Sequence, residues 1–296
     1  MIGYMFLALA LLAGATKGFC GKKISTATKE FGGAVKVNFI RMLFCIVIGI
    51  AVTLLKGEWG YIIPNGTDLI IALVSGVFTG IFVVTWLLSV RRNAYMMIEI
   101  FLTLGVAIPL IMSAIIFNEA VTVRQIIGIA ILAVGVYLMC LYNTSLKGKI
   151  TFGDWALLLA CGLSSGVTDF SQKLFIKSNT EMTTSVFNLY TYVFCAILLG
   201  IFCLIVKGKV SEKGEKVITP RVFTFILIMA LCLFANSYFK TVAAGYLDAV
   251  KLYPLNQGGA LILSTLMAAL LFREKITLNS IVGTVIAFAG LLVINM

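Results

Sequence analysis

The residues of this sequence that could do chemistry are a few charged side chains inside long apolar stretches. Lys17, Glu99 and Asp169 each lie within such a stretch. A charge inside a membrane span costs several kcal/mol of insertion free energy, so each of these residues is a functional candidate. A cation and two carboxylates are side chains that bind charged solutes or carry protons.

Lys17 and Asp169 occupy matching positions in two similar segments. An offset of 152 residues aligns "GATK", which ends at Lys17, with "GVTD", which ends at Asp169. A cation that faces a carboxylate suits a zwitterion such as an amino acid, or closes a gate by direct pairing. Two alternatives remain: Lys17 extends to the lipid headgroups, or Asp169 pairs with Lys173 one helical turn later.

Glu99 is the strongest candidate for proton coupling. It follows Met96, Met97 and Ile98 and lies about one and a half turns inside its apolar segment. A carboxylate in such a place can be protonated near neutral pH, as a proton-coupled carrier requires. Asp169 is a second candidate for this role. The alternative for Glu99 is a structural ion pair with a nearby cation, for which the candidates are Arg91, Arg92 and Lys251.

The segment "KLYPLNQGG", from Lys251 to Gly259, combines a proline, two amides and two glycines in an apolar context. Pro254 removes a backbone hydrogen bond and predicts a broken helix. A broken helix within a membrane is tolerated mainly where it lines a cavity. Tyr253, Asn256 and Gln257 are therefore expected to contact substrate. Alternatively, the two amides bond only to neighbouring helices.

Further polar and aromatic side chains lie in two other apolar segments. These candidates for substrate contact are Thr85 and Trp86, and Asn236, Tyr238 and Lys240. Aromatic rings can form an apolar or cation-binding wall, but Trp and Tyr also anchor helices at the membrane interface.

The composition explains why these polar residues are exceptional. Apolar residues make up 61% of the 296 residues, charged residues 12%, and the mean hydropathy is +1.08. A membrane helix needs about 20 mostly apolar residues, and the sequence predicts ten such helices with no sizeable soluble domain. Their expected ranges are 2–20, 34–55, 68–90, 94–117, 123–142, 153–175, 183–206, 221–244, 249–272 and 277–295.

Metal sites, cofactors and nucleic acid are not expected. The chain has no histidine, and its seven cysteines all lie in apolar segments and never at CxxC spacing. The formal net charge is +11, but the basic residues are spread over short loops and helix ends, unlike those of a nucleic-acid-binding face.

An internal repeat organises the chain. An offset of 155 residues aligns 94–138 with 249–293 without a gap, and it matches Glu119 with Glu274 and Gly128 with Gly283. The same register matches Phe117 with Phe272, Thr122 with Thr277 and Gly135 with Gly290. Because five spans are an odd number, the second copy must enter the membrane from the opposite side. We expect an all-α integral membrane protein with inverted repeats at 1–148 and 149–296.

The repeated segments 117–138 and 272–293, each with a glutamate and two glycines, resemble the signature of EamA-type members of the drug/metabolite transporter superfamily. The segment "NFIR", Asn38 to Arg41, is similar to the second helix of that family. The resemblance implies a central cavity lined by spans one, three, four, six, eight and nine. Glu119 and Glu274, at the span ends, are expected to fix helix junctions, and the matched Asn38 and Asn188 to join helices.

Together these features predict a secondary transporter for a small polar or zwitterionic metabolite, a multi-pass protein of the cell membrane that works by alternating access as a monomer or weak homodimer. The alternative is a membrane enzyme acting on a lipid-linked substrate, but the sequence offers no histidine and no DxxD grouping. The positive-inside rule places both termini outside the cell, whereas the family resemblance implies cytoplasmic termini.

Overall fold

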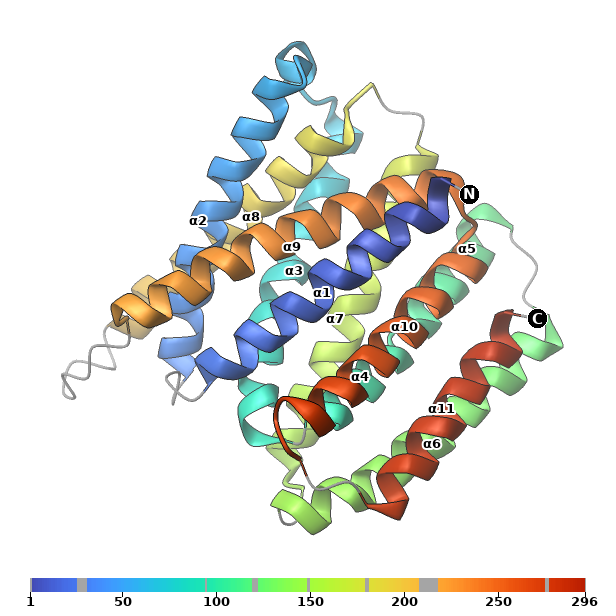
Figure 1. The fold of residues 1–296 in the computed structure, drawn as a ribbon. Coiled ribbons are helices and arrows are strands. Elements are labelled where there is room, and N and C mark those ends of the chain that lie inside the picture. Colours follow the sequence, from blue (N-terminus) through green and yellow to red (C-terminus); the bar gives the residue numbers. More distant parts are fainter. Residues whose placement is uncertain are drawn as a thin grey trace.

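The described part of the protein is entirely helical. The computed structural model describes residues 2–25, 31–93, 95–118, 122–147, 150–178, 181–207, 218–274 and 277–295 (Figure 1). The helices of the first half are α1 (Ile2–Ser25), α2 (Phe31–Leu55), the short η1 (Glu58–Tyr61), α3 (Gly66–Arg92), α4 (Tyr95–Leu104), α5 (Ala107–Phe117) and α6 (Val123–Lys147). Those of the second half are α7 (Phe152–Lys177), α8 (Thr184–Lys207), α9 (Pro220–Tyr246), α10 (Ala249–Leu270) and α11 (Leu278–Asn295).

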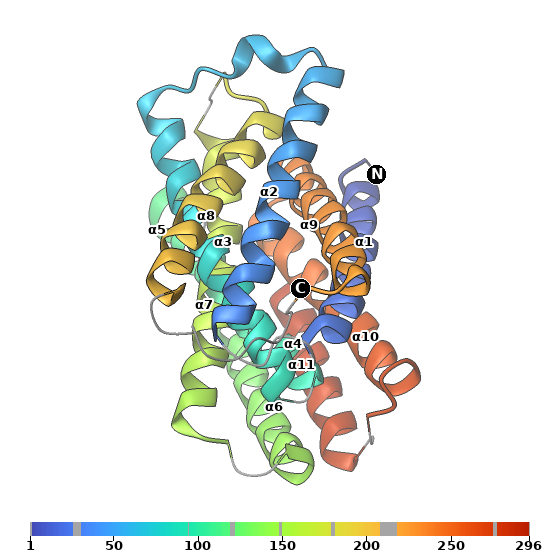
Figure 2. The same cartoon turned by 90° about the vertical axis from the view of Figure 1, so that its left-hand side faces the viewer.

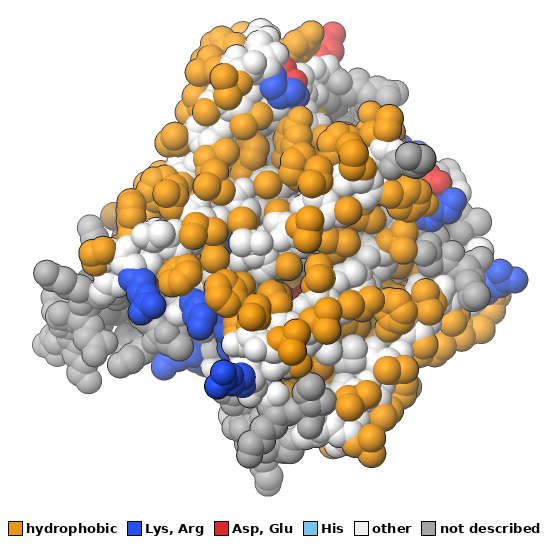
Figure 3. Space-filling view, viewed as in Figure 1, with side chains coloured by type: hydrophobic (Ala, Val, Ile, Leu, Met, Phe, Trp, Pro, Cys, Tyr) orange, Lys and Arg blue, Asp and Glu red, His pale blue; other side chains and the backbone are white. Residues whose placement is uncertain are grey.

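The outer surface of this helical bundle is apolar. Within the described residues, seven segments are long and apolar enough to cross a membrane. Hydrophobic side chains cover most of the face in Figure 3, and the visible Lys and Arg side chains lie mainly near its edges. Large apolar residues within the helices, such as Val47, Ile115 and Leu204, are more than three-fifths exposed. The protein is therefore embedded in the membrane and crosses it several times.

The segment expected as the fourth span is two helices. Helix α4 ends at Leu104 and α5 begins at Ala107. Pro109 explains the interruption, because it has no N–H to donate to the carbonyl of Gly105, four residues earlier. The break packs closely on α7: a Cβ on Gly105 would lie 2.3 Å from the carbonyl oxygen of Gly162.

The predicted break at Pro254 is wrong. Helix α10 continues through Pro254 from Ala249 to Leu270. Pro254 is the sixth residue of this helix, so its missing N–H removes a single bond to the first turn, and the helix bridges the gap.

The helices of the two halves pair across the molecule in a symmetric pattern. Helix α1 packs against α9, and its counterpart α7 packs against α3. The counterpart pairs α2 with α8, α4 with α10 and α6 with α11 are also in contact (Figures 1 and 2). Exchanging the two halves therefore leaves the set of principal contacts unchanged.

The repeated glycines form the contact between α6 and α11. A Cβ on Gly128 would lie 2.7 Å from the Gly290 carbonyl oxygen, and a Cβ on Gly135 would lie 3.1 Å from the Gly283 carbonyl oxygen. Small residues allow membrane helices to approach this closely. The 155-residue offset converts the first of these pairs into the second, so the two contacts are related by the repeat.

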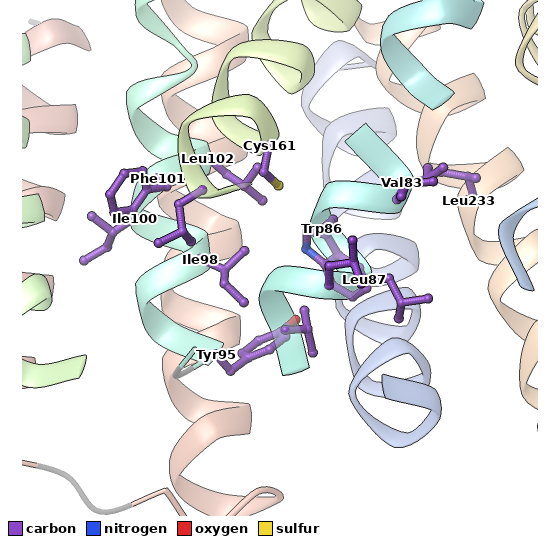
Figure 4. Close-up of a cluster of buried hydrophobic side chains, with 14 of the residues drawn as sticks. Val83, Trp86, Leu87, Tyr95, Ile98, Ile100, Phe101, Leu102, Cys161 and Leu233 are labelled. Carbon is purple, nitrogen blue, oxygen red and sulfur yellow. The ribbon is translucent and has the colours of Figure 1, made fainter. Parts of the chain in front are cut away.

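The buried core continues from this scaffold into the bundle centre. Part of it, drawn in Figure 4, joins α3, α4, α7 and α9. Its labelled side chains are Val83, Trp86, Leu87, Tyr95, Ile98, Ile100, Phe101, Leu102, Cys161 and Leu233.

Gly128→Ala is expected to lower the free energy of unfolding by about 1–3 kcal/mol, because the added methyl group overpacks a backbone contact. Thermal unfolding in detergent micelles measures this effect. Gly60→Ala is the matched control, since nothing lies within 4 Å of a Cβ there. Equal melting temperatures for Gly128→Ala and wild type would contradict the close packing.

Candidate functional site

A central cavity of about 100 Å³ lies between the two halves. On the same measure one water needs about 10–15 Å³, so the cavity holds several. It is lined by α1, α3, α4, α7, α9 and α10, together with Tyr192 of α8. These six helices are the spans one, three, four, six, eight and nine that the family resemblance implies as the cavity lining. Its charged and amide-bearing lining residues are Lys17, Glu99, Asp169, Gln172, Asn236, Lys240, Asn256 and Gln257.

An ion pair between the Lys240 ammonium on α9 and the Asp169 carboxylate on α7 lies on this wall. Both side chains are buried, Asp169 at 2% and Lys240 at 9% exposure. The hydroxyl of Tyr253 donates a 2.5 Å hydrogen bond to the backbone carbonyl of Asp169. Tyr253 thus contacts the backbone of Asp169, but it is not among the residues that line the cavity. Lys173, the alternative partner from the sequence, donates to the carbonyls of Ala244 and Leu247.

Lys17 and Glu99 form the first half's contribution to the same wall. The Lys17 ammonium lies 5.5 Å from the centre of the Phe82 ring, within the range of a cation–π contact. Glu99 is 8% exposed, and the Tyr95 hydroxyl is its hydrogen-bonding neighbour. The charge of Lys17 is the principal attractive charge acting on Glu99. The cavity thus contains opposite charges from both halves.

A chain of hydrogen bonds joins three helices beside the cavity. The Gln172 amide donates to the Ser237 hydroxyl at 3.1 Å, and Ser237 donates to the Asn188 carbonyl oxygen at 2.6 Å. Sequence reasoning missed Gln172 and Ser237 as site residues. The spacing of Ser165, Asp169 and Gln172, four and three residues apart, could have identified Gln172, since it defines one face of α7.

The predicted amides and Trp86 lie on the cavity wall, together with Asn236. The Asn236 amide donates to the Ala10 carbonyl at 2.7 Å, which joins α9 to α1. The carbonyl oxygen of Asn256 is buried and has no hydrogen-bond partner among the described residues. Asn256 therefore offers a free acceptor at the bundle centre.

Tyr238 and Thr85 are not brought to the cavity. The hydroxyl of Tyr238 accepts a hydrogen bond from the Lys56 ammonium at 3.1 Å, near the end of α2. Lys56 also pairs with Glu58. Burial alone would lower the pKa of Lys56, but its hydrogen bonds with Glu58 and Tyr238 raise the pKa above its ordinary value. Thr85 donates to the carbonyls of its own helix.

Glu274, from the repeated signature, fixes a helix junction as expected. Its carboxylate accepts a hydrogen bond from the Tyr95 backbone N–H at 3.1 Å and pairs with Lys22 at 3.1 Å. The carboxylate therefore holds the start of α4 and the end of α1 to the end of α10. Its repeat counterpart, Glu119, lies outside the described residues.

Asn38 and Asn188 join helices, as the sequence predicts. The Asn38 amide donates to the Val83 carbonyl of α3 at 3.1 Å. The Asn188 side chain accepts from Ser237 of α9. The two bonds link the second and third long helices of each half.

The sequence profile of the EamA-like transporter family matches residues 1–141 and 151–296. The chain belongs to this family of membrane transporters. The two matched ranges agree with the two halves that surround the cavity.

A solved structure titled "Crystal structure of protein" shares this fold. It aligns with a TM-score of 0.67 over 96% of this chain and 95% of that chain, at 14% sequence identity. The similarity supports the arrangement of the helices across the whole chain. The search against curated proteins gave no match.

Asp169→Asn is expected to lower the free energy of unfolding by about 3–5 kcal/mol, because it leaves the buried Lys240 ammonium without its counter-charge. Combining it with Lys240→Met removes both charges and is expected to restore most of the loss. Chemical denaturation of the single and double variants measures the coupling.

The control for this cycle is Arg92→Gln, which breaks the more exposed pair between Arg92 and Asp154. We expect this substitution to cost at most about 1 kcal/mol. Additive losses from Asp169→Asn and Lys240→Met would contradict the buried pair.

Proposed function

We propose that the protein is a secondary transporter that moves a small polar or zwitterionic metabolite across the cell membrane by alternating access. The observation that carries this proposal is the cavity at the centre of the bundle, because its wall combines Lys17 and Glu99 of the first half with Asp169 and Lys240 of the second. Ionisable residues within a membrane bundle mark pathways for solutes and ions. Family membership supports the same function.

The mechanism we propose uses two inverted five-span halves, 1–148 and 149–296, with the paired α4 and α5 acting as one span. The symmetric set of helix contacts supports this arrangement. The glycine contacts support it as well, because the 155-residue offset of the repeat converts the Gly128–Gly290 contact into the Gly135–Gly283 contact. Each inverted half can adopt the conformation of the other, which gives inward-open and outward-open states of similar free energy.

The chemistry of the wall supports a solute with both a charged and a hydrogen-bonding part. Lys17 and the Asp169–Lys240 pair offer charges of both signs, and Asn256, Gln257 and Asn236 offer amide donors and acceptors. The Trp86 ring supplies an apolar surface. Tyr253 acts as a positioning residue, because its hydroxyl holds the Asp169 backbone.

Glu99 is the carboxylate we propose for proton coupling, with Asp169 as the second candidate. Glu99 lies on the cavity wall, where a proton can reach it from water. The Asp169 carboxylate is already neutralised by Lys240. A proton that binds Glu99 leaves Lys17 without its attracting charge and changes the affinity of the cavity for a solute.

Asp169→Asn is expected to lower the rate of saturable solute uptake into proteoliposomes at least about tenfold, because it disrupts the charge pair on the cavity wall. Uptake is measured for a panel of amino acids, nucleosides, quaternary amines and phosphorylated metabolites. Tyr137→Phe, on the exposed face of α6, is the matched control. Unchanged kinetics in folded Asp169→Asn protein would remove Asp169 from the site.

Glu99→Gln is expected to abolish solute accumulation driven by a pH gradient while solute exchange across the membrane continues. The substitution keeps the shape of the side chain but removes its proton site. Accumulation and exchange are compared in the same proteoliposomes. Gradient-driven accumulation that survives in Glu99→Gln would show that another group carries the proton.

A further inference from the structure

Arg41 is a fully buried cation that the site described above does not use. It lies near the middle of α2 and is 2% exposed. Its Nε atom is enclosed without a hydrogen-bond partner, and no ion pair joins the guanidinium to any residue in the described ranges. A buried charge without a partner is strongly unfavourable, so this position requires a counter-charge that the described protein does not supply.

The neighbours of Arg41 do not provide this counter-charge. The titratable side chains that act most strongly on it are Cys45, Cys195 and Tyr192. The Cys45 thiol donates to the Ala230 carbonyl at 3.5 Å, and the Tyr192 hydroxyl donates to the Leu233 carbonyl at 3.3 Å. Thiols and a phenol carry no charge at neutral pH, so these three side chains supply no counter-charge.

Arg41 lies next to a residue of the cavity wall. Tyr192, its close neighbour, lines that cavity together with Leu233. Arg41 is also close enough to Lys17, which lines the cavity, for their positive charges to repel each other. Arg41 itself is not among the residues that line the cavity, so a group in the cavity has to pass Tyr192 to reach the guanidinium.

The four charged residues that line the cavity balance one another, and Arg41 beside it adds one positive charge. Asp169 neutralises Lys240, and Glu99 offsets Lys17. Of these three cations, Arg41 is then the one without a counter-charge among the described residues. A solute with a single anionic group balances this charge, and a guanidinium binds a planar carboxylate through two parallel hydrogen bonds.

We propose that Arg41 binds the carboxylate of the transported solute, which makes the substrate a small monocarboxylate or an amino acid. This inference rests on the proposed transport function and deepens it by naming the group that the cavity recognises. The side chain of Tyr192 separates the carboxylate subsite from the part of the cavity that holds the remainder of the solute.

The test is a thermal-shift assay on the purified full-length protein in lipid nanodiscs. The probes are lactate and alanine, each compared with its primary amide, and inorganic phosphate. We expect both carboxylates to raise the melting temperature of the wild type, since a ligand stabilises the state that binds it. The amides and phosphate are expected to have no effect.

Arg41→Gln is expected to weaken carboxylate binding by about 10- to 100-fold, because it removes charge-assisted hydrogen bonds. Without ligand it should melt no lower than wild type, since it removes an unpaired buried charge. Arg41→Lys keeps the charge and is expected to bind with intermediate affinity. Arg221→Gln, at the exposed start of α9, is the matched control and should bind as wild type does.

Three results would overturn the proposal: equal stabilisation of wild type and Arg41→Gln by carboxylates, stabilisation by the amides or phosphate instead, or no stabilisation by either carboxylate. A loss of stability in ligand-free Arg41→Gln with unchanged affinity would assign Arg41 a structural role only. Flux measurements separate this from the transport proposal. Carboxylate binding through Arg41 without saturable flux would contradict transport, whereas flux that is unchanged in Arg41→Gln would contradict the subsite alone.

Discussion

Hydrocarbon cannot solvate a charge, and this constraint explains the arrangement of the described helices. The ion pair between Lys240 and Asp169 joins α9 to α7 inside the bundle, where an unpaired charge is strongly unfavourable. Glu99 and Lys17 complete the same wall from the first half. The apolar surfaces of the helices then face outward, as expected of a protein whose solvent is lipid.

The packing of the remaining elements supports this polar centre from outside. Helices α6 and α11 pair through their glycines, and none of their described side chains lines the cavity. Glu274 connects α10 to α4 and α1, three helices that do line it. The repeated signature therefore serves helix packing and junctions, while residues outside the signature form the cavity wall.

The sequence predicted the helical class, the location of most helices and all but one of the charged and amide-bearing residues that line the cavity, because charge inside an apolar segment and the spacing of the repeat are local signals. It did not reveal that Lys240 is the partner of Asp169, since that contact joins segments 71 residues apart. The position of Tyr238 away from the cavity lining was not foreseen for a related reason: the direction of its side chain depends on its contact with Lys56. The helix is interrupted just before Pro109 but continues through Pro254. The periodicity of the sequence alone did not distinguish these two outcomes.

The most direct test of alternating access is the distance between the halves at each end of the bundle. Spin labels at Ile63 and Tyr246 report on one end, and labels at Phe31 and Phe152 report on the other, by double electron–electron resonance in nanodiscs. The account predicts two distance populations for each pair, and a crosslink that closes one end should shift the other end to its longer distance. A single unchanged distance at both ends, or ends that open and close together, would contradict it.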